Sequence, residues 1–204
     1  MSQPAATHPS DPTPFVTGLV LAGGQSKRMG ADKALVCWHG IPLLKRVCHV
    51  ALQCCDPVYV LTPWPERYQE VIPHACCILK ESNPGKGPLF ALLEGFSRLQ
   101  TTWILLLACD LPLLQADILK IWSTLLKNSQ TLAVVPYQEN QWEPLCGFYH
   151  HHSGPFLQSF LEHGGQSFQH WLSTLPTQKI ALDAPAQAML WNCNSPNDLI
   201  PPEV

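Results

Sequence analysis

Glycine, hydroxyl and cationic side chains are concentrated in one short stretch near the start of the chain. This stretch reads LAGGQSKRMGADK, residues 21 to 33, and directly follows an apolar run. Gly23 and Gly24 permit positive φ or close approach of a ligand, so that backbone N–H groups can cradle a base or phosphates. Within this stretch, Ser26 can supply a hydroxyl group, and Arg28 and Lys33 can supply positive charge. We therefore expect it to bind an anionic ligand that carries phosphates.

The glycine spacing of this stretch differs from two common phosphate-binding motifs. It is neither GxGxxG nor GxxxxGK[ST], because Lys33 comes late, after Met29-Gly30-Ala31-Asp32. The alternative interpretation is a tight turn in which Arg28 and Lys33 are merely solvated. The position of residues 21–33 at the end of an expected strand favours ligand binding, because ligands of open α/β sheets lie at the carboxyl ends of the strands.

A single carboxylate follows a second apolar run. The run extends from Trp103 to Ala108, and Asp110 comes two residues later. Mg²⁺ takes hard oxygen ligands and is commonly held by one or two carboxylates together with substrate phosphates. Asp110 is therefore a candidate ligand of a nucleotide-bound Mg²⁺. The alternative role is to cap the helix expected after Pro112, a common position for aspartate.

A third segment, Glu81 to Phe90, places two glycines immediately before an expected helix. Gly85 and Gly87 precede Pro88, which suits the first turn of a helix. The N–H groups at the start of that helix can face a nucleotide. The alternative is an ordinary glycine-rich turn that only leads into the helix.

The elements that must position these segments follow an alternating pattern. Short β-rich apolar runs alternate with helical patterns, which predicts an α/β fold with a mostly parallel sheet covered on both faces. The expected strands are Phe15–Leu21, Val58–Thr62, Cys76–Leu79, Trp103–Ala108, Thr131–Val135, Leu145–Tyr149 and Lys179–Leu182. Helical spacing predicts helices over 43–54 and 89–99, with Pro42 and Pro88 in their first turns.

Length and composition restrict the classes of protein that this chain can form. Its 204 residues are 46% hydrophobic and 13% charged, which favours a single domain over residues 15–204. A net charge of −3 without a basic cluster argues against nucleic acid as a partner. The apolar runs are much shorter than the roughly 20 residues of a membrane span. Residues 1–14 lack the features of a signal or transit peptide, so we expect a disordered tail and a cytoplasmic protein.

Neither the cysteines nor the histidines form a recognisable metal-binding motif. The nine cysteines include no CxxC pair, so reduced thiols that pack as small apolar side chains are the simpler interpretation. The run His150 to His152 is expected in a solvated loop, because adjacent side chains of an extended chain point in different directions. A cysteine-based redox or metal-storage protein is the weakest alternative.

Six segments, in the same order, resemble those of the molybdenum cofactor guanylyltransferases. LAGGQSKRMGADK is similar to the family's nucleotide-binding signature, GPLFAL at 87–92 to its glycine-proline-leucine segment, and CDLPLL at 109–114 to its metal-binding strand end. The other three lie at 143–149, 164–172 and 192–199. The resemblance covers about residues 16 to 200. It implies the three-layer α/β/α, Rossmann-like fold of the nucleotide-diphospho-sugar transferases.

The resemblance also implies a role for each candidate residue. It assigns nucleotide binding to Leu21, Ala22, Gly23, Gly24 and Ser26. Arg28 and Lys33 would contact the triphosphate and act in catalysis together with Asp110, which would also bind Mg²⁺. Glu81 stands where the family usually has an aspartate beside the nucleotide, and its side chain is one methylene longer. Gln166 stands where many relatives have arginine.

The implied reaction is attack by the terminal phosphate of molybdopterin on the α-phosphorus of GTP, with release of pyrophosphate. Gly24 and the segment 87–89 favour GTP over CTP, again by resemblance. The pterin would lie near segment 164–172, although burial in the core is the ordinary role of a tryptophan. Candidate side chains on that side are Ser167, Gln169, Trp142, Trp171 and Trp191.

Other partners and activities stay open at this point. The product could be delivered to a molybdoenzyme apo-protein, which is a further candidate partner. The alternative enzymes are CTP-specific or sugar-1-phosphate-specific nucleotidyltransferases of the same broad fold. A catalytically silent adaptor that binds nucleotide or cofactor is the alternative from another class.

Overall fold

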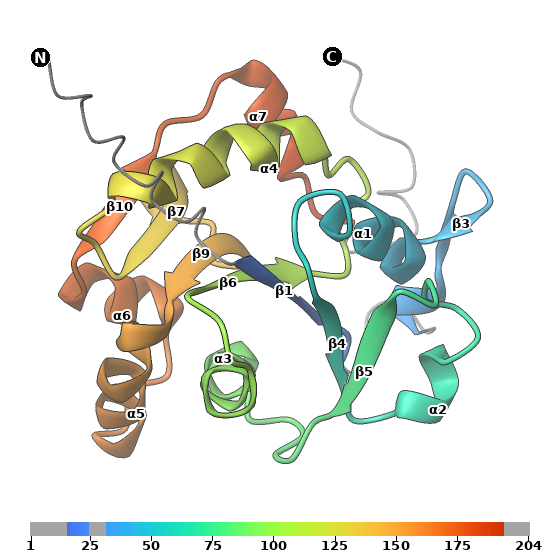
Figure 1. Ribbon diagram of the computed structural model, residues 1–204, viewed down its shortest axis with the longest axis horizontal. Helices are drawn as coiled ribbons and strands as arrows, with labels where there is room; N and C mark the ends of the chain where they lie inside the picture. The colour runs from blue at the N-terminus through green and yellow to red at the C-terminus, as the bar shows by residue number, and fades with distance from the viewer. Residues whose placement is uncertain (1–15, 25–31, 194–204) are drawn as a thin grey trace, which may run out of the picture.

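The computed structural model describes residues 16–24 and 32–193, which form a central sheet with helices on both sides (Figure 1). Its strands are β1 Val16–Leu21, β2 Cys37–Trp38, β3 Ile41–Pro42, β4 Val58–Thr62, β5 Cys76–Lys80, β6 Trp103–Ala108, β7 Ala133–Gln138, β8 Gln141–Trp142, β9 Cys146–His150 and β10 Thr177–Ile180. Its α-helices are α1 Leu43–Ala51, α2 Pro65–Tyr68, α3 Pro88–Arg98, α4 Ala116–Ser123, α5 Gly154–Glu162, α6 Phe168–Thr174 and α7 Ala184–Met189. Short 3₁₀ helices are Lys33–Leu35, Thr124–Asn128 and His151–Ser153.

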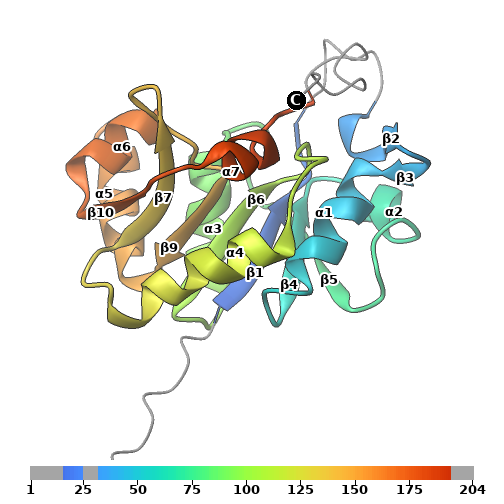
Figure 2. The ribbon, with the colours of Figure 1, turned by 90° about the horizontal axis from the view of Figure 1, so that it is seen from above.

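The sheet is mostly parallel. In the part of the chain that the structure describes it has eight strands, in the order β10-β7-β9-β6-β1-β4-β5, with β8 paired to β7. Strand β1 pairs in parallel with β4 and β6, whereas β9 runs antiparallel between β6 and β7. The carboxyl ends of β1, β4, β5 and β6 therefore meet at one edge of the sheet (Figure 2).

Strand β6 is buried on both faces, which explains its continuous apolar sequence. Leu105 and Leu107 belong to the core beneath α1, α4 and α7. Ile104 and Leu106 belong to a second core, against α3, α5 and α6. Figure 1 shows the first group of helices above the sheet and the second group below it. The predicted α/β/α fold is confirmed.

Two strands are displaced along the chain from their predicted positions. Strand β7 begins at Ala133 because the hydroxyl of Thr131 donates to the carbonyl oxygen of Ala133 at 3.0 Å and so holds a local turn. Strand β10 begins two residues early, because the Leu132 N–H donates to the Pro176 carbonyl oxygen at 2.8 Å. Asp183 then caps α7 by accepting the N–H of Ala186 at 3.0 Å.

The two helices predicted beside the glycine-rich segments are present. Helix α3 begins with Pro88 in its first turn, as expected. Helix α1 ends at Ala51, earlier than predicted, and Pro42 precedes its first turn. Pro42 lies before the helix because it pairs with Cys37 in the β2–β3 hairpin.

Two other predictions concern the tail and the membrane. The predicted disordered tail, residues 1–14, lies outside the described residues. Across residues 16–24 and 32–193, no helix is long and apolar enough to cross a membrane.

Candidate active site

A cavity of about 580 Å³ lies at the carboxyl ends of β1, β5 and β6. The residue after β1, Ala22, stays beside β4 at this edge, because its N–H donates to the Leu61 carbonyl oxygen at 3.0 Å. The cavity walls bring together parts of the chain that are far apart in sequence. They are formed by Leu21–Gly24, Asp32–Ala34, Tyr68, Glu81, Gly85, Gly87, Pro88, Ala91, Ala108–Asp110 and Leu145.

Most of the residues predicted to act on a nucleotide line this one cavity. They are Leu21, Ala22, Gly23, Gly24, Lys33, Glu81 and Asp110. Ser26 and Arg28 belong to the same predicted segment and lie outside the described residues. The three segments singled out from sequence therefore converge on one edge of the sheet.

Lys33 and Asp110 form an ion pair in the cavity wall. The Lys33 Nζ lies 2.5 Å from the Asp110 Oδ2, although 77 residues separate them in the chain. Their side chains are only 15% and 18% exposed. Asp110 does not cap the next helix, because α4 starts at Ala116 and follows Gln115. The alternative role of Asp110 as a helix cap is thus wrong.

The second carboxylate oxygen of Asp110 suits a hard cation. Oδ1 is buried and has no hydrogen-bond partner among the described residues. A buried, unsatisfied carboxylate oxygen is costly and is a reason to expect an additional ligand. Among residues 16–24 and 32–193, no three or more His, Cys, Asp or Glu side chains lie together as a metal site. A cation on Asp110 would therefore need oxygens from substrate phosphates or water.

The carboxylate of Glu81 lies against the glycine-rich segment. A Cβ placed on Gly23 would be 2.9 Å from the Glu81 Oε2, so the absence of a side chain at Gly23 makes room for this carboxylate. Burial raises the pKa of Glu81 above its ordinary value, and the negative charge of Glu94 raises it further. Glu81 therefore brings a half-buried acceptor to the cavity.

The loop before α3 contributes backbone to the cavity. Gly85 and Gly87 have φ of +82° and +90°, a conformation that disfavours other residues, and both line the cavity. Pro88 and Ala91, in the first turns of α3, line it too. The free N–H groups at this end of the helix favour negative charge. The turn is glycine-rich, as the alternative held, and it also faces the cavity.

Asp32 and Tyr68 line the cavity and were not predicted as site residues from sequence. Asp32 accepts the N–H of Ala34 at 3.2 Å and so caps the 3₁₀ helix that begins with Lys33. The Tyr68 hydroxyl donates to the other Asp32 oxygen at 2.8 Å, and Arg67 lies 3.7 Å from it. The capping role was visible in the sequence as an aspartate two residues before Ala34. Tyr68 gave no signal, because 36 residues separate it from Asp32.

The residues proposed for the pterin side are mostly engaged in the fold. The side chain of Gln169 bonds both the N–H and the carbonyl oxygen of Trp142, at 2.8 and 2.7 Å. Ser167 caps α6. Trp142 and Trp171 are 8% and 1% exposed, which is the core role considered ordinary for tryptophan. Trp191 is half-buried and packs against the ring of Trp38.

The histidine run is more ordered than predicted. His150 ends β9 and packs edge-on against the Trp103 ring, with ring centroids 4.8 Å apart. His151 and His152 are exposed and form a short 3₁₀ helix with Ser153. The expectation of a loop is wrong for His150, which pairs with Trp103 of β6, whereas His151 and His152 are exposed to solvent, as expected, in a helical turn.

Within residues 16–24 and 32–193, no disulfide joins the cysteines. Cys109 lines the cavity beside Asp110, and burial, followed by the Asp110 charge, raises the pKa of its thiol to about 12. Burial also raises the pKa of Cys54 to about 11. Such thiols are poor nucleophiles at neutral pH.

Comparison with known proteins identifies the family to which this architecture belongs. Residues 18–178 match a family model described as "MobA-like NTP transferase domain". A protein of Trichormus variabilis named "Probable molybdenum cofactor guanylyltransferase" is 44% identical over 186 residues, which cover 90% of this chain and 88% of that protein. The chain belongs to the molybdenum cofactor guanylyltransferase family. It is a nucleotidyltransferase.

Further relatives of this guanylyltransferase family member agree in sequence or in fold. A Synechococcus elongatus protein of the same name is 40% identical over 184 residues, covering 88% of this chain and 94% of that protein. A crystal structure of molybdopterin-guanine dinucleotide biosynthesis protein A from Archaeoglobus fulgidus superposes with a TM-score of 0.76. That structure is 17% identical and covers 90% of this chain and 94% of its own, so it supports the fold.

Proposed function

We propose that this protein transfers GMP from GTP to molybdopterin or the molybdenum cofactor, forming a guanine dinucleotide and releasing pyrophosphate. The observation that carries the proposal is the Lys33–Asp110 pair in the wall of the cavity, beside the glycine-rich segment. Cation and carboxylate together suit a triphosphate and its metal ion. The names of the curated relatives support GTP and molybdopterin as the two substrates.

The reaction needs no protein nucleophile. The terminal phosphate oxygen of molybdopterin forms a bond to the α-phosphorus of GTP, and the bond from that phosphorus to the bridging oxygen of the β-phosphate breaks. Pyrophosphate leaves with the bonding electrons. Because both reactants are anions, the protein must hold them in line and neutralise their charge. Lys33 and, within the same segment, Arg28 are the cations that we assign to this task.

Asp110 is the residue that we assign to Mg²⁺. Its buried Oδ1, which has no hydrogen-bond partner in the part of the chain that the structure describes, fits a hard cation, and its other oxygen is held by Lys33. Asp110 would hold the Mg²⁺, which would supply positive charge for the phosphate oxygens. Lys33 orients the Asp110 carboxylate and contributes a second positive charge beside it.

Glu81 is the side chain that we assign to the base. Guanine presents two adjacent N–H donors, N1–H and the 2-amino group, which a single carboxylate can accept together. Adenine presents an acceptor at N1, which a carboxylate repels. The backbone of Leu21 to Gly24, with Ser26, completes the proposed nucleotide contacts. The position of Glu81 against Gly23 supports this assignment.

The remaining parts of the proposal concern the setting of the reaction. We place it in the cytoplasm and in a single nucleotidyltransferase domain over residues 15–204. A molybdoenzyme apo-protein that receives the dinucleotide is a further proposed partner.

Pyrophosphate release tests the proposal. Purified protein is mixed with molybdopterin, Mg²⁺ and each of GTP, CTP, ATP and UTP. We expect release with GTP alone, dependent on both Mg²⁺ and molybdopterin. Release with CTP would assign the protein to cytidylyl transfer instead. Binding of GTP without any release would support a silent carrier and refute the proposed activity.

A further inference from the structure

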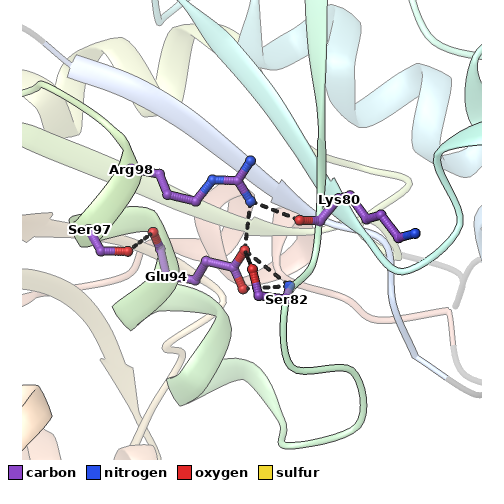
Figure 3. A network of polar contacts seen from close by, with 5 residues as sticks. All are labelled: Lys80, Ser82, Glu94, Ser97 and Arg98. Atoms are coloured by element: carbon purple, nitrogen blue, oxygen red, sulfur yellow. Dashed lines mark hydrogen bonds and ion pairs between the residues drawn. The ribbon is translucent and has the colours of Figure 1, made fainter.

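Glu94 is a buried carboxylate on α3 that lies outside the cavity wall and binds the segment next to Glu81 (Figure 3). Its side chain is only 8% exposed. The Ser82 N–H donates to both of its oxygens, at 2.9 and 3.1 Å, and the Ser82 hydroxyl donates to Oε1 at 2.8 Å. Arg98, one turn further along α3, donates to Oε1 at 2.7 Å. Four donor contacts thus converge on one carboxylate.

The same network holds the chain on the other side of Glu81. The Arg98 guanidinium, besides pairing with Glu94, donates to the carbonyl oxygen of Lys80 at 2.8 Å. The Glu81 N–H itself donates to the Thr62 carbonyl oxygen at 2.8 Å. Both neighbours of Glu81 are therefore tied to α3, and its own backbone is tied to β4. These contacts restrain the backbone from which the Glu81 carboxylate reaches Gly23.

The ionisation of Glu94 is consistent with this role. Burial by itself would raise the pKa of Glu94, but the hydrogen bonds from Ser82 and the Arg98 charge outweigh burial and keep the pKa below its ordinary value. Glu94 is therefore a carboxylate at neutral pH and a strong acceptor.

We propose that Glu94, with Arg98, is a positioning residue for base recognition: it fixes the segment Lys80 to Ser82 so that the Glu81 carboxylate faces guanine. The inference rests on the proposed function. Glu94 does not touch the nucleotide in this account, and it acts through the backbone on either side of Glu81. It therefore sets the preference for GTP over ATP more than the rate of phosphoryl transfer.

A buried ion pair that merely stabilises the fold is the competing explanation, and the two differ in what they predict. A purely structural pair would alter the free energy of unfolding and leave selectivity unchanged. A positioning pair would weaken GTP binding selectively, because a misplaced carboxylate no longer meets both donors of guanine. Loss of a hydrogen bond to a charged partner corresponds to about tenfold in affinity.

The test compares Glu94→Gln with the wild-type protein. Dissociation constants for Mg-GTP and Mg-ATP are measured by calorimetry, and kcat and KM by pyrophosphate release with molybdopterin. We expect Glu94→Gln to raise both the GTP dissociation constant and KM about tenfold, to leave ATP binding nearly unchanged, and to lower kcat less than about threefold. A folded variant whose GTP-to-ATP preference equals that of the wild type would overturn the inference.

Two serine variants keep the test decisive if Glu94→Gln does not fold. Ser82→Ala removes one hydroxyl contact to Glu94, and a smaller loss of GTP preference, about threefold, is expected. Ser153→Ala is the control, because it also removes a hydroxyl contact: the buried Ser153 hydroxyl donates to the His150 carbonyl oxygen at 2.8 Å. This contact lies near the start of β6, away from the cavity at the carboxyl end of the strand. A Ser82→Ala variant whose preference for GTP over ATP equals that of Ser153→Ala and of the wild type would overturn the inference.

Failure of the proposed function gives a different result. A wild-type protein that releases no pyrophosphate with GTP and molybdopterin would refute guanylyl transfer and, with it, the premise of the inference. A wild-type protein that is active and prefers GTP, beside a Glu94→Gln variant that prefers it equally, refutes the positioning role alone.

Discussion

Replacement of Asp110 by asparagine should separate catalysis from folding. The substitution keeps the shape of the side chain and removes its charge. Asparagine is a weak ligand for Mg²⁺ and a weaker partner for Lys33, whose ammonium lies 2.5 Å from Oδ2. Both consequences arise in the wall of the proposed nucleotide cavity.

The size of each effect follows from the surroundings of the pair. Loss of one charge contact to a reacting phosphate commonly lowers kcat about 10² to 10³-fold. Exposed ion pairs contribute about 1 kcal/mol or less, whereas breaking a buried pair costs about 3–5 kcal/mol. The Lys33 and Asp110 side chains retain some contact with water, so we expect a stability loss of about 1–2 kcal/mol. At about 2–4 °C per kcal/mol for a chain of this size, Tm should fall by about 2–8 °C.

The assay is pyrophosphate release at saturating GTP, Mg²⁺ and molybdopterin, together with thermal unfolding. Asp117→Asn is the matched control, because Asp117 also faces a lysine, Lys120 at 3.7 Å, but is 92% exposed and lies outside the cavity wall. We expect this control to keep wild-type kcat and Tm. A kcat of Asp110→Asn within threefold of the wild type, in a folded protein, would refute the assignment of Asp110 to the reacting phosphates.

Three other predictions concern the cavity wall. GTP affinity should fall as pH falls through the raised pKa of Glu81, because protonation removes the acceptor, and titration of GTP binding should show a weaker dependence in Glu81→Gln. Gly23→Ala should lower the free energy of unfolding by about 1–3 kcal/mol, since its Cβ would lie 2.9 Å from the Glu81 carboxylate. Chemical unfolding of Gly24→Ala should match the wild type, because, apart from its chain neighbours, no heavy atom of the described residues lies within 4 Å of a Cβ at this position. Tyr68→Phe removes the hydroxyl contact to Asp32 and should cost about 1–3 kcal/mol of stability and raise KM for GTP; wild-type values of both would contradict a role in holding this segment.

The fold could be predicted because its signals are local. The continuous apolar run of β6 reflects burial on both faces, and Pro88 marks the start of α3. The start of β10 was missed because a contact from elsewhere in the chain moved this boundary. The start of β10 is set by a hydrogen bond between Leu132 and Pro176, 44 residues apart in the numbering, and no local pattern contains that information.

The candidate site divides in the same way. Lys33 was recognisable because it lies in a glycine-rich stretch after a strand, and Asp110 because it follows a buried strand, whereas Glu81 was assigned through the family resemblance. That Lys33 pairs with Asp110 was not predictable, since side-chain pairing depends on the order of strands in the sheet. Glu94 was missed for another reason: within an amphipathic helix, a glutamate is typical of a solvated face, and only the fold shows that it is buried against Ser82.

The most direct test of guanylyl transfer follows each phosphorus atom of GTP. The wild-type protein is incubated with Mg²⁺, molybdopterin and GTP that carries an oxygen isotope label either on the α-phosphate or on the β- and γ-phosphates. The products are then separated and their masses are measured by mass spectrometry. We expect the α-label in a pterin-guanine dinucleotide and the other label in pyrophosphate. Release of the α-label as free GMP or GDP, with the pterin unchanged, would contradict it.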